Sequence, residues 1–276
     1  MDNIILLVLT GFAIGTLGTL IGAGGGFILV PLLLLTHPSL SAEKVTSISM
    51  AIVACNAVSG TVAYARSRRI DYRAGIVFAV FTIPGSILGV LATRYIPRHL
   101  FNITFGAVLI LLGIFLFFNT KDNKDVADMQ KEENGWKHHK QTDRLGHHYS
   151  YYFNQYRGIL ISVIVGFLSP ILGIGGGIIH VPALVQWLQF PVHIATATSQ
   201  FILAVMSVVS VAVHIIKGSY HDPYILRMVI GLSLGVIAGA QLGAVLSQKM
   251  KGKVIIRALA VSLALVGVRI LIGTGI

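Results

Sequence analysis

Apolar residues occur in long runs along this chain of 276 residues. The runs cover residues 4–35, 45–65, 74–93, 99–118, 158–189, 194–216, 224–247 and 254–272. Most are close to the roughly 20 residues that a helix needs to cross the hydrocarbon core of a membrane. They lack the strict alternation of an outer-membrane barrel strand. The pattern therefore predicts an all-α polytopic membrane protein.

Two of these runs contain a glycine cluster that should break the helix. GAGGGFILVP at 22–31 and GIGGGIIHVP at 173–182 each carry three consecutive glycines and then a proline. Glycine in a helix interior costs about 1 kcal/mol and proline about 3 kcal/mol. Each run holds 32 residues, more than one untilted crossing needs at about 1.5 Å per residue. Each segment is therefore predicted to be either a kinked single crossing or a re-entrant hairpin, with protein or water around the break.

The two halves of the chain resemble each other on either side of a polar insert at 119–157. The glycine clusters align at an offset of 151 residues, and Thr46-Ser47 aligns with Thr198-Ser199 at 152. GSILG at 85–89 aligns with GAQLG at 239–243 at an offset of 154. Three matches in the same order indicate a duplication. The predicted organisation is a transmembrane repeat at 1–118, a cytoplasmic loop at 119–157 and a second repeat at 158–276, with four helical segments in each repeat.

The charge pattern supports a membrane protein and suggests its orientation. Only 11% of residues are charged, and the mean hydropathy is +0.81. The net charge of +11 comes from Lys and Arg between the apolar runs, as the positive-inside rule predicts. Re-entrant segments would place 15 of these cations on one side and 6 on the other, whereas single crossings give 14 and 7. The re-entrant alternative is favoured, and its three crossings per repeat make the two repeats inverted.

A helix break inside a membrane can bind an anion. The first backbone N–H groups of the helix that follows have no partners, and the helix dipole adds about half a unit of positive charge there. No Asp or Glu lies near the centre of a predicted span, so nothing attracts a cation. The two breaks are therefore expected to hold an anion or a neutral substrate. Helix packing alone is the alternative for the triple glycines, and it is the expected role of Gly11, Gly15 and Gly231.

Polar side chains inside the apolar runs are the other candidate ligands. Four hydroxyl residues, two near the start of the span after each break, could cap the helix or bind substrate. Three amide side chains lie in apolar runs. Each needs a hydrogen-bond partner, either on a neighbouring helix or on a substrate oxygen. His180, which stands where the first repeat has Leu29, could donate to an anion, relay a proton or be a satisfied core residue. The predicted substrate-binding set is Gly24, Gly25, Gly26, Thr46, Ser47, Asn56, Gly175, Gly176, Gly177, His180, Thr198, Ser199, Gln200 and Gln241.

Several other classes of protein are disfavoured. The glycine clusters do not make G-x-G-x-x-G, and no G-K-[ST] follows them, so a nucleotide site is not expected. No catalytic residues, cofactor or metal are predicted, because there is no H-E-x-x-H or nucleophile–base set. The paired histidines at 138–139 and 147–148 could bind metal or sense pH, but a solvated, mobile polar loop is expected. The single cysteine, Cys55, excludes an intrachain disulfide.

The motifs resemble those of the TauE/SafE family of sulfite exporters, also called the toluene-sulfonate uptake permease family. The resemblance covers nearly the whole chain. It rests on GAGGGFILVP with Thr46-Ser47, on GIGGGIIHVP with ATATSQ at 195–200, and on PGSILG at 84–89 with AGAQLG at 238–243. It implies a prokaryotic-type plasma-membrane permease for sulfite, sulfonates or related organosulfur anions. The acceptor oxygens of such anions suit N–H, hydroxyl and amide donors.

The predicted function is secondary transport of such an anion by alternating access, with export as the expected direction. The alternatives are an anion channel, an uptake permease for another small anion and, less favoured, a membrane enzyme or an assembly scaffold. The expected partners are the small sulfur anion and the lipid of the plasma (inner) membrane. Nucleic acid is not expected, and the oligomeric state is left open, with a homodimer as one option.

Overall fold

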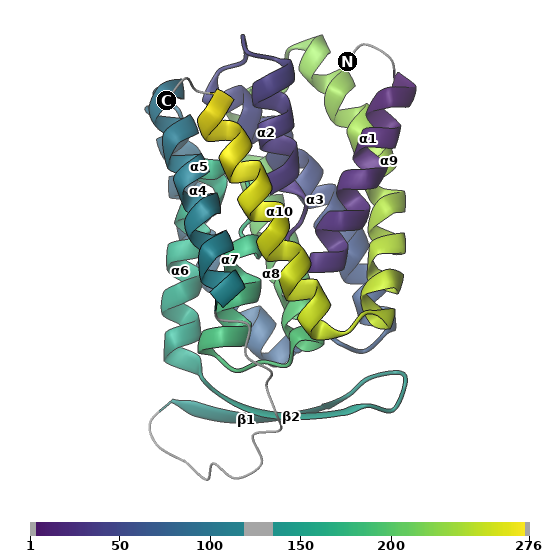
Figure 1. Ribbon diagram of the computed structural model, residues 1–276. Helices are drawn as coiled ribbons and strands as arrows, with labels where there is room; N and C mark the ends of the chain where they lie inside the picture. Colours follow the sequence, from purple (N-terminus) through teal and green to yellow (C-terminus); the bar gives the residue numbers. More distant parts are fainter. Residues whose placement is uncertain (1–3, 119–134, 274–276) are drawn as a thin grey trace.

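The computed structural model describes residues 4–118 and 135–273, which form a helical bundle with a β-hairpin at one end (Figure 1). The elements before residue 119 are α1 (Ile4–Ile21), α2 (Gly26–Thr36), α3 (Ala42–Arg66), α4 (Tyr72–Thr93) and α5 (Arg98–Phe118). The hairpin consists of β1 (Trp136–Thr142) and β2 (His148–Asn154). The elements after it are α6 (Gln155–Leu172), α7 (Gly177–Pro182), the π-helical turn η1 (Ala183–Trp187), α8 (Val192–Ile216), α9 (Pro223–Lys249) and α10 (Gly252–Gly273).

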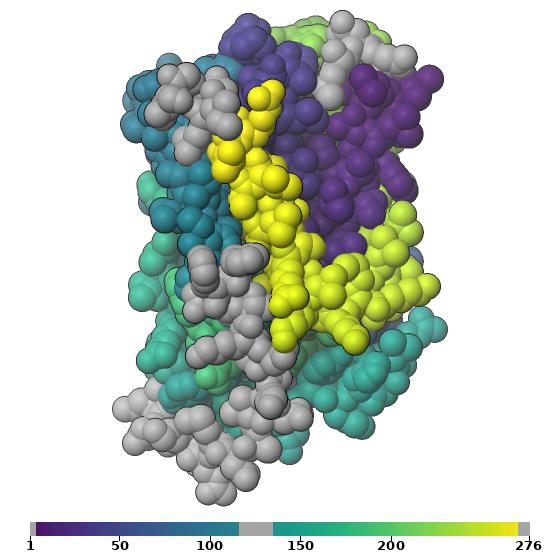
Figure 2. All heavy atoms as spheres, viewed as in Figure 1, coloured from purple at the N-terminus to yellow at the C-terminus, as the bar shows by residue number. Residues whose placement is uncertain are grey.

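The bundle has the properties of a membrane protein. Seven of the described helices are long and apolar enough to cross a membrane, namely α1, α3, α4, α5, α6, α8 and α9. Leu9, Leu88 and Leu234 point outward with 61%, 58% and 58% of their surface exposed, which suits contact with lipid. Figure 2 shows α10 crossing one face of the bundle between α5 and α1. The predicted polytopic helical membrane protein is confirmed.

Each glycine cluster ends one helix and begins another. Residues 22–25 separate α1 from α2, and residues 173–176 separate α6 from α7. Six glycines in these breaks have φ between 67° and 81°, a left-handed backbone that residues with a Cβ rarely adopt. They are Gly22, Gly24, Gly25, Gly173, Gly175 and Gly176. The prediction of a break in each cluster is confirmed.

The two broken segments enter the bundle from different ends. In Figure 1, the outer ends of α1 and α2 both lie at the upper end of the bundle. The α6 helix instead starts at the lower end, beside the β-hairpin, and the chain returns there after α7 and η1. The two breaks are thereby brought to the interior of the bundle from opposite directions.

Glycines allow α1 to pack closely along α9. A Cβ built on Gly11 or Gly15 of α1 would lie 2.2 or 2.6 Å from a backbone oxygen of α9. A Cβ on Gly231 of α9 would meet Leu7 at 3.0 Å. The packing role predicted for these three glycines is confirmed. On the opposite side, α6 packs along α4 in the same manner, with Gly85 against the backbone of the α6 turn around 163–167.

We expect Gly235→Ala to destabilise the protein by about 1–3 kcal/mol, because overpacking a tight contact forces the backbone apart. The new Cβ would lie 1.9 Å from the backbone oxygen of Val8. Gly231→Ala, one turn earlier on the same helix, is the matched control, since the atoms nearest to its Cβ belong to the Leu7 side chain and lie no closer than 3.0 Å. Thermal unfolding in detergent measures both variants, and equal melting temperatures would contradict this packing.

The C-terminal part of the polar insert is not the mobile loop that the sequence predicted. Residues 136–154 form an antiparallel hairpin in which His139 pairs with Tyr151. In the strand HYSYYFN an aromatic residue stands at every second position, at 149, 151 and 153, and Tyr151 and Phe153 are only 3% and 1% exposed. This alternation is typical of a half-buried strand. His138, His147 and His148 belong to the same hairpin and its turn, whereas residues 119–134 lie outside the described part of the chain.

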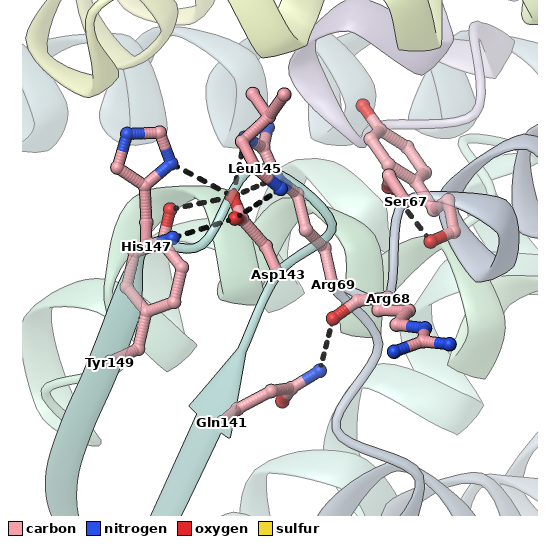
Figure 3. A network of polar contacts seen from close by, with 9 residues as sticks. Ser67, Arg68, Arg69, Gln141, Asp143, Leu145, His147 and Tyr149 are labelled. Carbon is pink, nitrogen blue, oxygen red and sulfur yellow. Dashed lines mark hydrogen bonds and ion pairs between the residues drawn. The ribbon is translucent and has the colours of Figure 1, made fainter.

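A buried ion pair fastens the hairpin to the α3–α4 loop (Figure 3). The Arg69 guanidinium donates to the Asp143 carboxylate at 2.9 and 3.1 Å. The backbone N–H groups of Leu145 and His147 also donate to this carboxylate, at 2.9 and 3.0 Å. Burial alone would raise the pKa of Asp143, but the bonds from Arg69 and His147 outweigh it and lower the pKa to about 2. Asp143 is therefore ionised at neutral pH.

A second anchor involves the residue that caps α4. Asp71 accepts hydrogen bonds from the Tyr151 hydroxyl at 2.6 Å and from the backbone N–H of Ala74 at 3.1 Å, and its other partner is His139. Burial alone would raise the pKa of Asp71, but these bonds outweigh it and lower the pKa. The hairpin is thus tied at two points to the loop between α3 and α4.

Candidate functional site: the junction of the two helix breaks

The two breaks lie against each other in the core. A Cβ built on Gly26 would lie 2.6 Å from the carbonyl oxygen of Gly173. A Cβ on Gly177 would lie 2.3 Å from the carbonyl oxygen of Gly22. The contact is reciprocal. The first residue of α2 touches the first residue of the second break, and the first residue of α7 touches the first residue of the first break. We call this contact region, formed by residues 22–27 and 173–178, the junction.

The α3 and α8 helices contact the junction with matching serines. Ser49 donates its hydroxyl proton to the carbonyl oxygen of Gly173, and Ser199 donates to that of Gly22 at 3.2 Å. These contacts relate α3 to α8 at an offset of 150 residues. The sequence alignment at 152, which paired Ser47 with Ser199, is therefore wrong by two residues. Threonine and serine recur at short spacing in both helices, so the sequence alone allows an offset of either 150 or 152 residues.

The hydroxyl candidates do not cap their helices. They are Thr46, Ser47, Thr198 and Ser199. All four lie inside helices, because α3 begins at Ala42 and α8 at Val192, so the capping alternative is wrong. Thr46 and Ser47 donate to carbonyls of the preceding turn at 3.0 and 2.9 Å. Thr198 accepts from the backbone N–H of Asp71 at 3.0 Å, and Ser199 contacts the junction. A role of these hydroxyls in binding substrate stays a prediction.

The helices α2 and α7, which follow the two breaks, each begin with backbone N–H groups that have no partner among the described residues. At the first break, Gly25 accepts from Ile28 and Leu29 at 3.1 Å. Within the described part of the chain, however, no acceptor is found for the N–H groups of residues 25–27. The same is true of residues 176–178, again counting only 4–118 and 135–273 as possible partners. An unpaired buried N–H is unfavourable, so an acceptor that arrives here is stabilised.

Three polar side chains from different helices meet beside the first break. The Thr19 hydroxyl of α1 donates to Asn56 Oδ1 of α3 at 2.7 Å. Gln200 Nε2 of α8 lies 3.3 Å from Thr19 Oγ1 and 3.3 Å from the backbone oxygen of Asn56. All three side chains are 0% exposed. Among the described residues, Asn56 Nδ2 and Gln200 Oε1 have no partner.

The sequence predicted two members of this group and missed the third. Asn56 and Gln200 stand out as amides in apolar runs, whereas Thr19 does not. A threonine in an apolar helix usually bonds a carbonyl one turn earlier, so its sequence carries no sign of a long-range partner. Ser169, whose hydroxyl would lie 2.9 Å from a Cβ on Gly176, was also missed.

The remaining two candidates contact neighbouring helices. His180 Nε2 lies 3.5 Å from the Ser162 hydroxyl of α6, and its Nδ1 has no partner in the described residues. Gln241 Nε2 donates to the backbone oxygen and the hydroxyl of Ser59, both at 2.8 Å. Gln241 therefore links α9 to α3, and the structure does not bring it to the junction contacts described above. Its role in binding substrate stays a prediction.

The junction offers hydrogen-bond donors without a charged side chain. The buried Arg, Lys, Asp and Glu of the described residues are Arg69, Asp71 and Asp143, which all belong to the anchors of the hairpin. No group of three or more His, Cys, Asp or Glu that could hold a metal occurs in the residues described. The local field at the junction therefore comes from helix N-termini and dipoles, an arrangement that stabilises an anion.

Comparison with known proteins gives the family. A sequence model described as "Sulfite exporter TauE/SafE" matches residues 7–270. The chain is 32% identical over 275 residues to "Probable membrane transporter protein YunE" of Bacillus subtilis, which covers 98% of this chain and 97% of that protein. It is 25% identical over 258 residues to a probable membrane transporter protein of Methanocaldococcus jannaschii, covering 90% and 88%. No solved structure matches. The chain belongs to the TauE/SafE sulfite exporter family and is a multi-pass membrane transporter, not an enzyme.

Proposed function

We propose that this protein exports a small sulfur oxyanion, sulfite or an organic sulfonate, across the plasma membrane. The observation that carries the proposal is the junction, where two helix N-termini with unpaired buried N–H groups meet. Each N-terminus contributes about half a unit of positive charge. Two of them match the single negative charge of a sulfonate. A sulfonate also brings three acceptor oxygens, which suit several donors at once.

The two repeats, residues 1–118 and 158–276, would be inverted and would rock about the junction. The opposite entry of the two hairpins (Figure 1) and the reciprocal contacts of Gly26 and Gly177 support this arrangement. Paired broken helices near the middle of inverted repeats are the typical location of a transporter's binding site. Rocking would open the junction first to one side and then to the other, which is alternating access.

The charge distribution supports an orientation. The α3–α4 loop, the β-hairpin and the α9–α10 turn lie at the lower end of the bundle (Figure 1). These segments and the helix ends next to them, residues 66–73, 136–157 and 249–257, hold 12 of the 21 Lys and Arg residues, so the lower end would face the cytoplasm. An anion that leaves from this side moves with the membrane potential, which favours export of one negative charge by about 2.3 kcal/mol per 100 mV. A coupling ion is therefore not required.

Sulfite counterflow in proteoliposomes tests the proposal. We expect saturable counterflow that methanesulfonate inhibits and that methanesulfonamide does not. The two inhibitors have nearly the same shape, but the sulfonamide replaces an anionic oxygen by a neutral amide. Equal inhibition by both would contradict an anion site at the helix N-termini. Ionic currents far above carrier turnover, without counterflow, would favour the anion channel instead.

A further inference from the structure

We infer that the anion binds on one side of the junction, at the first break. Its ligands there are the Asn56 carboxamide and the N–H groups of residues 25–27, and Thr19 and Gln200 orient the carboxamide. This inference rests on the proposed function, because it assigns the binding site of that anion. It makes Thr19 and Gln200 positioning residues for one anion-binding side chain, that of Asn56. It also means that the two breaks contribute differently to binding.

Two nitrogen donors that have no partner among the described residues lie beside Gly18. A Cβ built on Gly18 would lie 2.4 Å from the backbone nitrogen of Gly25 and 2.9 Å from Asn56 Nδ2. Asn56 is 0% exposed, and its Nδ2 has no partner among the described residues. A backbone N–H at the start of α2 and a buried amide therefore converge on one position. An acceptor placed between them would satisfy both donors.

The hydrogen bonds around Asn56 place the nitrogen end of its carboxamide toward the space beside Gly18. Gln200 Nε2 lies 3.3 Å from the backbone oxygen of Asn56, which only accepts hydrogen bonds. The nitrogen of the Gln200 amide must therefore be the atom at this position, and it also donates to the Thr19 hydroxyl. Thr19 has one proton to give, and it gives it to Asn56 Oδ1. Asn56 Nδ2 is left with its hydrogens for an external acceptor.

The second break has no equivalent of this amide. The position that matches Gly18 at the offset of 151 is Ser169, and the one that matches Asn56 at 150 is Met206. A Cβ built on Gly176 would lie 2.9 Å from Ser169 Oγ and 3.2 Å from Met206 Cε. A hydroxyl and an apolar thioether methyl therefore occupy the space that corresponds to the donor pair at Gly18. The second break offers one hydroxyl where the first offers a primary amide.

The site is closed in this structure. The space beside Gly18 is too narrow even for a methyl group, and a sulfonate is larger. The two closest atoms, the nitrogen and Cα of Gly25, belong to the same α1–α2 hairpin as Gly18. The anion would therefore enter only when the tip of this hairpin opens and Asn56 of α3 moves back. Binding and opening of the first hairpin would occur together, as alternating access requires.

Binding measurements on the purified full-length protein, with methanesulfonate as the titrated ligand, test the inference. Asn56→Asp keeps the acceptor for Thr19, removes the donor and adds a negative charge, so we expect the Kd to rise by about tenfold or more. Thr19→Val removes the orienting hydroxyl and should also raise the Kd by about tenfold, whereas Thr19→Ser should bind like the unchanged protein. Thr93→Val is the matched control, because the buried Thr93 hydroxyl donates to Gly89 in its own helix at 2.9 Å.

The selectivity for methanesulfonate over methanesulfonamide separates positioning from structural support. A merely structural role of Thr19 would lower the melting temperature of Thr19→Val and leave this selectivity intact. We expect the selectivity to collapse in Thr19→Val and to return in Thr19→Ser. If Asn56→Asp does not fold, the two Thr19 variants decide the question. Wild-type Kd and selectivity in Thr19→Val would overturn the inference, and binding of no sulfur oxyanion by the unchanged protein would instead overturn the proposed function.

Discussion

Gly26→Ala and Gly177→Ala are each expected to reduce sulfite flux by about 100-fold or more, the loss that a displacement near 1 Å can cause at a binding site. The new Cβ would lie 2.6 or 2.3 Å from a carbonyl oxygen of the opposite break. A carbonyl of the backbone cannot rotate away, so the two breaks must separate. Neither glycine has positive φ, and alanine is a good helix former. The substitutions therefore test the contact between the breaks and nothing about backbone strain.

Gly75→Ala is the control for these two variants. Gly75 is also buried, lies in the first turn of α4 and has no positive φ. Its new Cβ would meet the ring of Phe201 at 2.9 Å, and a ring can shift where a backbone carbonyl cannot. We expect flux close to that of the unchanged protein. Normal flux in Gly26→Ala and Gly177→Ala, with normal insertion, would show that the breaks need not touch during transport.

Arg69→Ala is expected to release the β-hairpin at a cost of about 3–5 kcal/mol, because it leaves the buried Asp143 carboxylate without its cation. The two side chains are only 3% and 0% exposed, so water does not replace the lost partner. Hydrogen exchange of residues 136–154 measures the release. Arg68→Ala is the control, since Arg68 is exposed and its contact with Gln141 uses the backbone oxygen. Equal protection of the hairpin in both variants would contradict the anchor.

The same ion pair makes the docking of the hairpin depend on pH. The pKa of Asp143 is about 2 in the folded protein and 3.8 for an unperturbed carboxyl group. A lowered pKa stabilises the folded state at pH values above the unfolded pKa, and the stabilisation is lost as the pH falls from about 4 through 2. We therefore expect the hairpin to stay docked at neutral pH and to loosen in this acid range. Arg69→Ala should weaken that dependence.

The sequence was sufficient for the features that depend on local chemistry. Three adjacent glycines disfavour a helix whatever surrounds them, so the breaks at 22–25 and 173–176 could be predicted. Isolated glycines such as Gly15 leave room for a neighbouring backbone, and their packing role followed. The β-hairpin had a local signal too, the aromatic residue at every second position of HYSYYFN, but the polar composition of the insert suggested a mobile loop. The buried partner that stabilises this segment, Arg69, comes from a distant part of the chain.

The register between repeats and the polar group at the first break depend on long-range contacts. The offset of α8 against α3 is set by which serine reaches the opposite break, and two nearby hydroxyls fit the sequence equally well. Thr19, Asn56 and Gln200 are brought together from α1, α3 and α8. A threonine that bonds a distant amide has the same neighbours in sequence as one that bonds its own helix. The structure was needed to tell these cases apart.

The location of a bound anion tests the central claim most directly. Selenite has the shape and charge of sulfite, and selenium can be located by its anomalous scattering in crystals of the protein with selenite. We expect a single strong peak at the junction, with its oxygens within hydrogen-bonding distance of the N–H groups of residues 25–27 and of Asn56 Nδ2. Selenite bound at another place in the bundle, in a protein that also transports it, would contradict the claim that the two helix breaks form the binding site.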